Sequence, residues 1–440
     1  MALRAVSLFS NCGAGDVGYA RAGFRFDVMA ELEPERLSVA LLNHRSATGV
    51  AGDLRTTLPS VVKAWKDRRG SDRPDLLAAC PPCQGMSTIR SGRGMESDAD
   101  AGSRDPRNLL VEVIADAVDK LRPRALIVEN VRAFLTKRVW DPRTGEPISA
   151  AALLAIRLKD RYVLQPAIVQ MADYGVPQNR QRVFMTFFDR RDVAASTIHT
   201  HGISPYPSPS HSGQHVSVDQ ALRDMRLSKL DASRPELARD RERELHSVPV
   251  WEERRYAMVA AIPPDSGKTA WQNDTCLECG SVTDATEAAI CVECNAILPR
   301  PVVHDEKGPR LISGFRRSSY SRMNPNLPAA TITTASGRVG GSNTIHPSQN
   351  RVLSPLECAR LQTFPENFRW GNSRELHGDG FVREVIGEAV PPRFTEAHGK
   401  IVASLLNGRR PRVALSSSSP TVLRATRILL AESGLPSLTN

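Results

Sequence analysis

The first 188 residues alternate short apolar runs with amphipathic helical patterns, and this alternation restricts the fold more than any other feature of the chain. Short strands that are each followed by a helix are typical of a mostly parallel sheet covered on both faces. Apolar residues also recur at helical spacing between 109 and 121. We therefore predict a doubly wound, mostly parallel α/β domain, with strands at residues 6–9, 26–30, 76–79, 125–128 and 183–188.

The alternation stops after this stretch and returns further along the chain. A connector rich in Pro and Ser at 201–211 opens the intervening part, which lacks the strand and helix rhythm. We expect a large domain formed by residues 1–188 and 326–406, interrupted by a smaller domain at 189–325. The final segment, 407–440, carries five arginines against one acidic residue, so we expect a flexible basic tail.

The overall composition limits the setting of the protein. The chain has 58 Lys and Arg against 48 Asp and Glu, which gives a net charge of +10. This excess is weak support for a polyanionic partner, because many basic proteins bind no nucleic acid. No apolar run reaches the ~18 residues of a membrane span, and the first residues do not resemble a signal peptide. We expect a cytoplasmic protein with no membrane partner.

A glycine-rich turn follows the first predicted strand. Gly13, Gly15 and Gly18 fit the G-x-G-x-x-G pattern, in which glycines let a nucleotide approach the N-terminus of a helix. Glu31 lies at the end of the second strand, where a carboxylate can accept both hydroxyls of a ribose. Together these residues indicate an adenosine-containing cofactor, either a dinucleotide or S-adenosylmethionine.

Cys80-Pro-Pro-Cys83 follows the apolar strand at 76–79. Its spacing could belong to a dithiol redox centre, but the surrounding residues do not resemble a thioredoxin motif. The rigid Pro-Pro step instead presents one thiol at the carboxyl edge of the sheet, where open α/β sheets bind their ligands. We predict that Cys83 is a nucleophile.

Two further strands bring charged residues toward the same edge. Glu129 closes the fourth strand, and a lone carboxylate in such a place is more often solvated than catalytic. Arg180 and Arg182 precede the last strand, where alternation would place both on one face. They could form a solvated pair or a fork of donors to a base or phosphate.

Four of the eight cysteines form a separate group within the smaller domain. Two Cys-x-x-Cys knuckles separated by eleven residues can supply four thiolates to one ion. In a reducing compartment such clustering indicates metal binding rather than disulfides. We predict a zinc ribbon whose structural ion is bound by Cys276, Cys279, Cys291 and Cys294.

In their order along the chain, these motifs resemble those of DNA (cytosine-5) methyltransferases. The resemblance covers residues 1–188 and about 325–405, and it implies a methyltransferase-type sheet whose smaller domain is a target recognition domain. The segments that carry it are Phe9 beside the glycine turn, Pro82-Cys83-Gln84, Glu129-Asn-Val, Gln178-x-Arg-x-Arg182, the stretch 351–365, and Gly387-x-x-Val390-Pro-Pro.

The resemblance implies a role for each catalytic residue. Cys83 would attack C6 of a cytosine flipped out of the duplex, and Glu129 would protonate N3 of the base. Arg182 would hold O2 of the base, and Arg180 would shape the nucleophile loop. The expected contacts with S-adenosylmethionine are Phe9, Gly13, Gly15, Glu31, Leu32, Asp53, Leu54, Pro81 and Val390.

Some features depart from the family pattern. The family's first glycines fall on Asn11, Gly13 and Ala14, and Glu388-Ala389 replaces the usual Asn-Ser pair. The smaller domain has 18 Lys and Arg against 19 Asp and Glu, so the basic excess of the chain lies elsewhere.

The resemblance also implies partners and a biological setting. We expect a monomer acting on double-stranded DNA in a bacterial, nucleoid-associated restriction-modification or defence system, with a cognate nuclease as a candidate partner. An RNA (tRNA) cytosine-5 methyltransferase shares these motifs, although the large insert favours DNA. A catalytically silent DNA-binding regulator need not retain Cys83 and Glu129. A nicotinamide oxidoreductase would not explain Pro-Cys-Gln together with Glu-Asn-Val.

Overall fold

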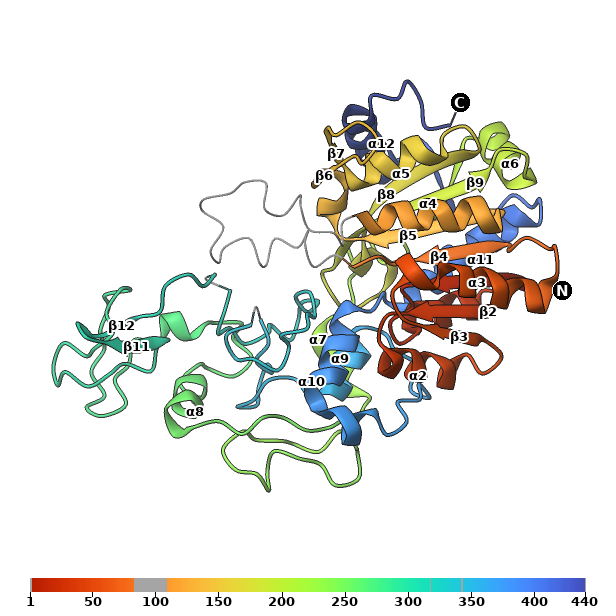
Figure 1. The fold of residues 1–440 in the computed structure, drawn as a ribbon. Coiled ribbons are helices and arrows are strands. Elements are labelled where there is room, and N and C mark those ends of the chain that lie inside the picture. Colours follow the sequence, from red (N-terminus) through yellow and green to blue (C-terminus); the bar gives the residue numbers. More distant parts are fainter. Residues whose placement is uncertain (1, 83–108, 317, 342, 440) are drawn as a thin grey trace.

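The computed structural model describes residues 2–82, 109–316, 318–341 and 343–439. They form two lobes, and both ends of the chain lie in the larger one (Figure 1). Within the described residues, the larger lobe contains a seven-stranded sheet. Its strands are β1 (Leu3–Leu8), β2 (Phe24–Glu31), β3 (Thr48–Ala51), β4 (Leu76–Ala79), β5 (Ala125–Asn130), β8 (Tyr162–Gln170) and β9 (Gln181–Asp189).

The sheet is mostly parallel, as the sequence predicted. The strand order is β3-β2-β1-β4-β5-β9-β8, and β9 runs antiparallel to both of its neighbours. All five predicted strands form, while β3 and β8 were not predicted. The direction of strand addition reverses between β1 and β4, which are neighbours. In open α/β sheets, such a reversal at the carboxyl edge creates the crevice in which ligands bind.

Helices cover both faces of the sheet, because successive strand residues point to opposite sides. In β1, Val6 and Leu8 pack into one core and Ala5 packs into the other. Among the described helices, none combines the length and hydropathy that a membrane span requires. The first face is covered by α3 (Leu54–Arg69), α4 (Leu110–Leu121), α5 (Ala150–Leu158) and α12 (Pro420–Ser433), and the second by α1 (Ala14–Arg21), α2 (Pro34–Asn43), α6 (Val193–His201) and α11 (Pro392–Leu406).

The C-terminal part of the chain returns to complete this domain. Helix α11 lies directly against α1, since a Cβ atom added to Gly18 would lie 2.0 Å from Thr395 Oγ1 and 2.3 Å from the Pro392 carbonyl oxygen. The glycine at position 18 is therefore required for contact between two helices. Residues from the two ends of the chain thus pack together in the larger lobe.

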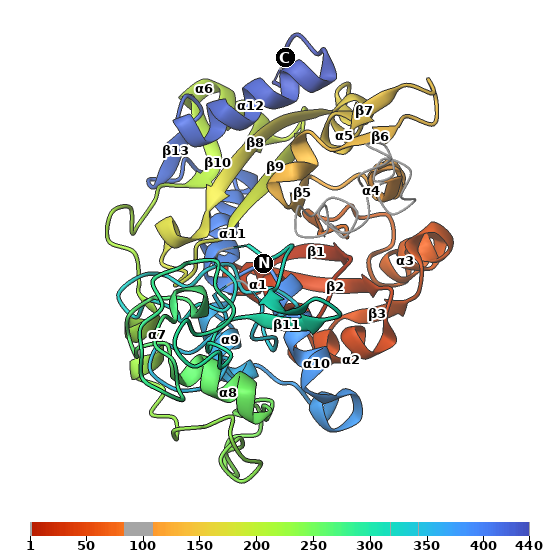
Figure 2. The same cartoon turned by 90° about the vertical axis from the view of Figure 1, so that its left-hand side faces the viewer.

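The prediction of a flexible basic tail at 407–440 is wrong. Strand β13 (Ala414–Ser416) pairs with β10 (Ile203–Pro207), and α12 lies along β8 and α5 (Figure 2). Val422, Ala425 and Leu429 are buried at helical spacing on one side of α12. The arginines drew attention to charge, whereas these three apolar residues determine that the segment packs on the sheet.

The smaller lobe has its own hydrophobic core, which includes Trp251, Trp271 and Tyr320. This core draws on residues from Leu230 to Val352, while α6 and β10 pack on the larger lobe. The hydrophobic cores therefore place the boundaries of the smaller lobe later in the chain than the expected positions 189 and 325. The remaining elements are β6 (Arg138–Trp140) and β7 (Pro147–Ser149) in the larger lobe, α8 (Glu253–Ala260), β11 (Val302–Asp305) and β12 (Gly308–Leu311) in the smaller lobe, and α7 (Val218–Arg223), α9 (Pro355–Leu361) and α10 (Ser373–Glu388) between them.

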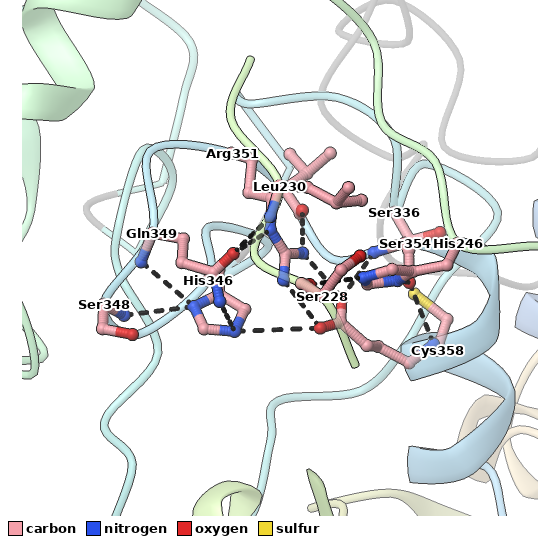
Figure 3. Close-up of polar contacts among 12 residues, drawn as sticks. Ser228, Leu230, His246, Ser336, His346, Ser348, Gln349, Arg351, Ser354 and Cys358 are labelled. Carbon is pink, nitrogen blue, oxygen red and sulfur yellow. Dashed lines mark hydrogen bonds and ion pairs between the residues drawn. The ribbon is translucent and has the colours of Figure 1, made fainter. Parts of the chain in front are cut away.

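A buried polar network joins the smaller lobe to α9 (Figure 3). Arg351 donates two hydrogen bonds to Glu357, at 2.7 and 2.8 Å. Burial alone would raise the pKa of Glu357, but Arg351 lowers it to about 2. The side chain of Ser354 caps α9 and lies 2.9 Å from His246 Nδ1, and Gln349 Oε1 accepts from Arg351 Nε. The network thus joins residues 246, 349 and 351 to the start of α9.

Candidate active site

Glu129 lies between a thiol and a guanidinium at the carboxyl edge of the sheet. It is in β5 and is only 6% exposed. Cys80, directly after the neighbouring strand β4, donates a hydrogen bond from Sγ to Glu129 Oε2 at 2.8 Å. On the other side, Arg182 of β9 places its Nε 3.2 Å from Glu129 Oε1. Three adjacent strands thus bring together residues that the sequence linked only by motif order.

The residue after Glu129 holds the same loop. Asn130 Nδ2 donates a hydrogen bond to the carbonyl oxygen of Pro81 at 3.0 Å, and both residues are buried. Consecutive residues of β5 therefore hold Cys80 and Pro81, which begin the segment leading to Cys83. Cys83, the predicted nucleophile, lies outside the described residues. Sequence reasoning missed Asn130 as a contributor, although its place in Glu129-Asn-Val was a signal.

Arg180 and Arg182 have different partners. Arg180 is 1% exposed and donates hydrogen bonds to the carbonyl oxygens of Ile332 at 3.0 Å, Gly387 at 3.1 Å and Ala389 at 3.0 Å. Arg182 instead faces Glu129. Arg180 thus shapes the wall of the site, because its guanidinium joins the start of β9 to Ile332 and to the end of α10.

The turn after β1 has three residues with left-handed backbone: Phe9 (φ 56°), Asn11 (φ 48°) and Gly13 (φ 72°). At Gly13 an added Cβ would also lie 3.0 Å from the His44 ring. Helix α1 begins at Ala14, so Gly15 is inside the helix. A Cβ atom added to Gly15 would lie 3.2 Å from Val390 Cβ. The predicted glycine loop is therefore formed by residues 9–13, and Gly15 and Val390 pack together beneath it.

Glu31 at the end of β2 supports this turn. Its Oε2 accepts a hydrogen bond from the Asn11 amide at 2.7 Å, and its Oε1 accepts from the Leu32 amide at 2.9 Å. Burial raises the pKa of Glu31, and the amide donors oppose that effect. The side chain of Leu32 is 58% exposed beside the carboxylate. An apolar surface next to a buried acceptor is suited to a flat, hydroxyl-bearing ligand such as a nucleoside.

Asp53 and Leu54 lie where the chain enters α3. Asp53 is the N-cap residue, and its carboxylate accepts a hydrogen bond from the Arg55 amide at 2.9 Å. Hydrogen bonds from Arg55 lower the pKa of Asp53. Leu54 is buried in the core. Asp53 therefore reaches the same cavity as Glu31 while already serving as a helix cap.

The departure at Glu388 has a partner that the sequence did not reveal. Arg36 of α2 is mostly buried and forms an ion pair with Glu388, together with ion pairs to Glu33 at 2.8 Å and Glu384 at 3.2 Å. Glu388 also lines the space beside the turn after β1. Its carboxylate thus links α10 to α2 at the cofactor end of the site.

Glu31, Asp53, Glu129 and Glu388 border one cleft of about 2420 Å³ between the lobes. The end formed by β1, β2 and α10 is acidic, with Glu31, Glu33 and Glu388. Arginines also line the cleft, and three of them, Arg132, Arg316 and Arg338, form no ion pair with any residue that the structure describes. These residues come from both lobes. The cleft therefore has an end suited to a cation and a wall suited to a polyanion.

The four ribbon cysteines meet in space. Their Sγ atoms all lie within 4.8 Å of one another, and the Cys276–Cys294 and Cys279–Cys291 pairs are each 3.6 Å apart. Each knuckle turns through a left-handed residue, Gly280 (φ 74°) or Asn295 (φ 59°). A tetrahedral ion with sulfur at about 2.3 Å requires sulfurs about 3.8 Å apart. The arrangement can therefore hold one zinc ion.

Buried side chains tie the ribbon to the smaller lobe. Arg300 donates hydrogen bonds to the carbonyl oxygens of Asn273 at 2.6 Å and Ala288 at 2.9 Å, and Asn273 Nδ2 donates to the Met258 carbonyl oxygen at 2.9 Å. Between 274 and 299 the sequence has five acidic residues and neither Lys nor Arg. The ribbon is thus an acidic unit on a basic protein.

The sheet order, the residues at its carboxyl edge and the cleft define a nucleotide-cofactor enzyme of the methyltransferase type. The sequence model for C-5 cytosine-specific DNA methylase matches residues 3–403, so the chain belongs to this family and is a DNA (cytosine-5) methyltransferase. The family implies S-adenosylmethionine as methyl donor and DNA as substrate.

Similar proteins span nearly the whole chain. The Type II methyltransferase M1.HgaI of Avibacterium volantium is 25% identical over 89% of this chain and 95% of its own length. M1.HphI of Haemophilus parahaemolyticus is 25% identical, covering 92% and 88%. A DNA modification methyltransferase encoded within an E. coli prophage shares the fold, with a TM-score of 0.53 and 20% identity over 92% of this chain and 100% of its own.

Proposed function

We propose that the protein methylates C5 of cytosine within a specific sequence of double-stranded DNA, through a covalent adduct between Cys83 and a flipped-out base. The observation that carries this proposal is Glu129, held between Cys80 and Arg182 and open to the cleft. A restriction-modification setting is supported by relatives named Type II methyltransferases that align over most of their length.

The acidic end of the cleft fits S-adenosylmethionine. Asn11 Oδ1 is buried and has no hydrogen-bond partner among the described residues, so it is available to a donor. Glu31, Leu32 and Asp53 would bind the nucleoside, with Phe9 beside it. Glu388 adds negative charge where the cationic end of the cofactor would lie. When bound, S-adenosylmethionine supplies an electrophilic methyl group; the residues of the chain hold it toward the substrate.

The chemistry on the base would depend on two groups of the chain. The Cys83 thiolate adds to C6, while Glu129 delivers a proton to N3, so that the negative charge pushed into the ring is neutralised and C5 becomes nucleophilic. Arg182 would hold O2 of the base. After C5 gains the methyl group, loss of the C5 proton to water, cleavage of the Cys83–C6 bond and return of the N3 proton to Glu129 restore the aromatic ring, the thiolate and the carboxylic acid.

The smaller lobe would act as the target recognition domain. It supplies one wall of the cleft, and Arg316 and Arg338 on that wall are suited to DNA phosphates or bases. Arg322 belongs to the structure of the lobe instead, because its buried guanidinium donates to the carbonyl oxygens of Ile262 and Gln349. Cys276, Cys279, Cys291 and Cys294 would hold a structural zinc ion, which their sulfur-only donor set and spacing favour.

The test is covalent trapping on DNA that contains 5-fluorocytosine. We expect wild-type protein with S-adenosylmethionine to form an adduct that survives denaturing electrophoresis, because fluorine at C5 cannot leave as a proton would. Cys83→Ser should bind the same DNA without an adduct. Methylation of a mixed genomic DNA, with mapping of the modified cytosines, then identifies the recognition sequence. Methylation of tRNA in place of DNA would overturn the proposal in favour of an RNA enzyme.

A further inference from the structure

Among the described residues, Cys80 has the side chain that lies closest to the Glu129 carboxylate. The proposed reaction gives Cys80 no role. Ala79 of β4 pairs with Val128 of β5, so the next residue on each strand, Cys80 and Glu129, are neighbours across the parallel ladder. The Cys80 thiol reaches Glu129 Oε2 at 2.8 Å. The register of two buried strands therefore determines this contact.

We propose that Cys80 is a positioning residue that orients Glu129 for proton delivery, an inference that rests on the function proposed above. The two oxygens of the carboxylate face unlike groups. Oε1 faces the permanent cation of Arg182, whereas Oε2 faces a neutral thiol. A guanidinium can only donate, but a thiol can donate weakly to a carboxylate and accept weakly from a carboxylic acid. Oε2 is thus the oxygen that can gain and release a proton while its contact persists.

The surroundings of Glu129 agree with this division. Besides Cys80, the titratable groups that line the space behind the carboxylate are Cys12, Asp16, Tyr19 and Glu388. The first three are buried, Asp16 accepts a hydrogen bond from Ser7 Oγ at 2.8 Å, and Glu388 forms an ion pair with Arg36. The contacts described for Glu129 therefore leave its orientation to the Cys80 thiol and Arg182.

The same thiol also connects the proton donor to the nucleophile segment. Cys80 is followed by Pro81, whose carbonyl oxygen accepts from Asn130 Nδ2 at 3.0 Å. Glu129 and Asn130 thus hold two consecutive residues of the chain that leads to Cys83. Without the thiol, the position of Glu129 relative to Cys80 and Pro81 would be less fixed. Small misplacements of reacting groups lower the reaction rate strongly.

The experiment compares Cys80→Ala and Cys80→Ser, with Cys358→Ala as control because Cys358 is a buried cysteine in α9 away from Glu129. Single-turnover methylation is measured with saturating DNA and S-adenosylmethionine. We expect Cys80→Ala to slow methyl transfer about 10-fold, a modest share of the ~10²-fold or more of general acid catalysis. We expect Cys80→Ser to stay within about threefold of wild type, because serine restores a donor.

Rescue by serine separates positioning from a purely structural role. Serine restores a donor to the carboxylate and alanine does not, so a positioning role predicts that Cys80→Ser recovers the rate that Cys80→Ala loses. Equal rate losses in both variants, or a wild-type rate in Cys80→Ala, would overturn the inference. Failure of wild type to form the 5-fluorocytosine adduct would instead reject the proposed function, so the two failures are distinguishable.

Discussion

Arg180 donates a hydrogen bond to the carbonyl oxygen of Gly387, 207 positions later in the sequence, at 3.1 Å. The same guanidinium binds the Ile332 and Ala389 carbonyl oxygens. One buried side chain thus joins the start of the strand that carries Arg182 to Ile332 and to the end of α10. The site wall is continuous because of these contacts, although the chain that forms it is interrupted.

Arg180→Lys should destabilise the protein without changing the groups that act on the substrate. A lysine cannot reach three carbonyl oxygens in different directions, so we expect the free energy of unfolding to fall by about 3 kcal/mol. Urea denaturation measures this, with Arg161→Lys as control because Arg161 is exposed and pairs only across the surface with Asp119. Unchanged stability with lost turnover would show that Arg180 acts on the substrate itself.

Glu129→Gln should impair chemistry more than binding. The amide keeps the size of the side chain but delivers no proton to N3, so single-turnover methyl transfer should slow by about 10²-fold or more. DNA affinity, measured by fluorescence anisotropy, should change far less. Glu396→Gln is the control, a change at a partly exposed position of α11 where the carboxylate pairs with Lys400. A variant that transfers methyl at the wild-type rate would remove Glu129 from the mechanism.

Glu31→Ala should weaken S-adenosylmethionine binding, because it removes the carboxylate that we propose as the ribose acceptor and that holds the Asn11 amide. We expect at least a 10-fold loss by calorimetry, about 1.4 kcal/mol. Glu33→Ala is a matched control two residues away, since Glu33 is half-exposed and binds Arg36. Equal losses in the two variants would indicate a general charge effect instead of a ribose contact.

The ribbon should hold about one zinc ion per chain, bound only by sulfur, which elemental analysis of protein purified without chelator can measure. Cys279→Ser should lose the ion and weaken sequence-specific DNA binding, or unfold residues 271–300, because a segment this small depends on its metal for folding. S-adenosylmethionine binding should persist.

Because the ribbon between 274 and 299 has neither Lys nor Arg, the salt dependence of nonspecific DNA binding should not change in Cys279→Ser. Cys358→Ser serves as the control. Full sequence specificity in a zinc-free preparation, or cofactor binding lost together with the metal, would contradict the assignment of the ribbon to the recognition lobe.

Asp16 should make stability depend on pH. Burial raises the pKa of Asp16 to about 7 although Ser7 donates a hydrogen bond to it. The folded state therefore binds a proton that the unfolded state releases near pH 4, and stability from this group falls as pH rises from about 4 to 7. Asp16→Asn should stabilise the protein by up to about 4 kcal/mol at pH 9 and by much less at pH 5. Urea denaturation at both pH values tests this.

The fold class could be predicted because strand and helix patterns are local. Five of the seven strands follow from short apolar runs, while β3 is short and half-buried and β8 includes Pro166, so neither gave a clear pattern. The packing of α12 was missed although its apolar residues recur at helical spacing, since the arginines around them dominated the composition of 407–440. Local charge said little about a helix whose other face is buried.

The ribbon cysteines and the glycine turn depend on spacing within a few residues, and local geometry then determines how they meet. For this reason the chain alone was enough to group Cys276 with Cys279 and Gly13 with the first strand. The partners of Glu129, Arg180 and Glu388 depend on strand register and on helix packing across long stretches of chain. Many distant pairings satisfy the same apolar pattern, and only close packing of the folded core selects the one that brings Cys80 to Glu129 and Arg36 to Glu388.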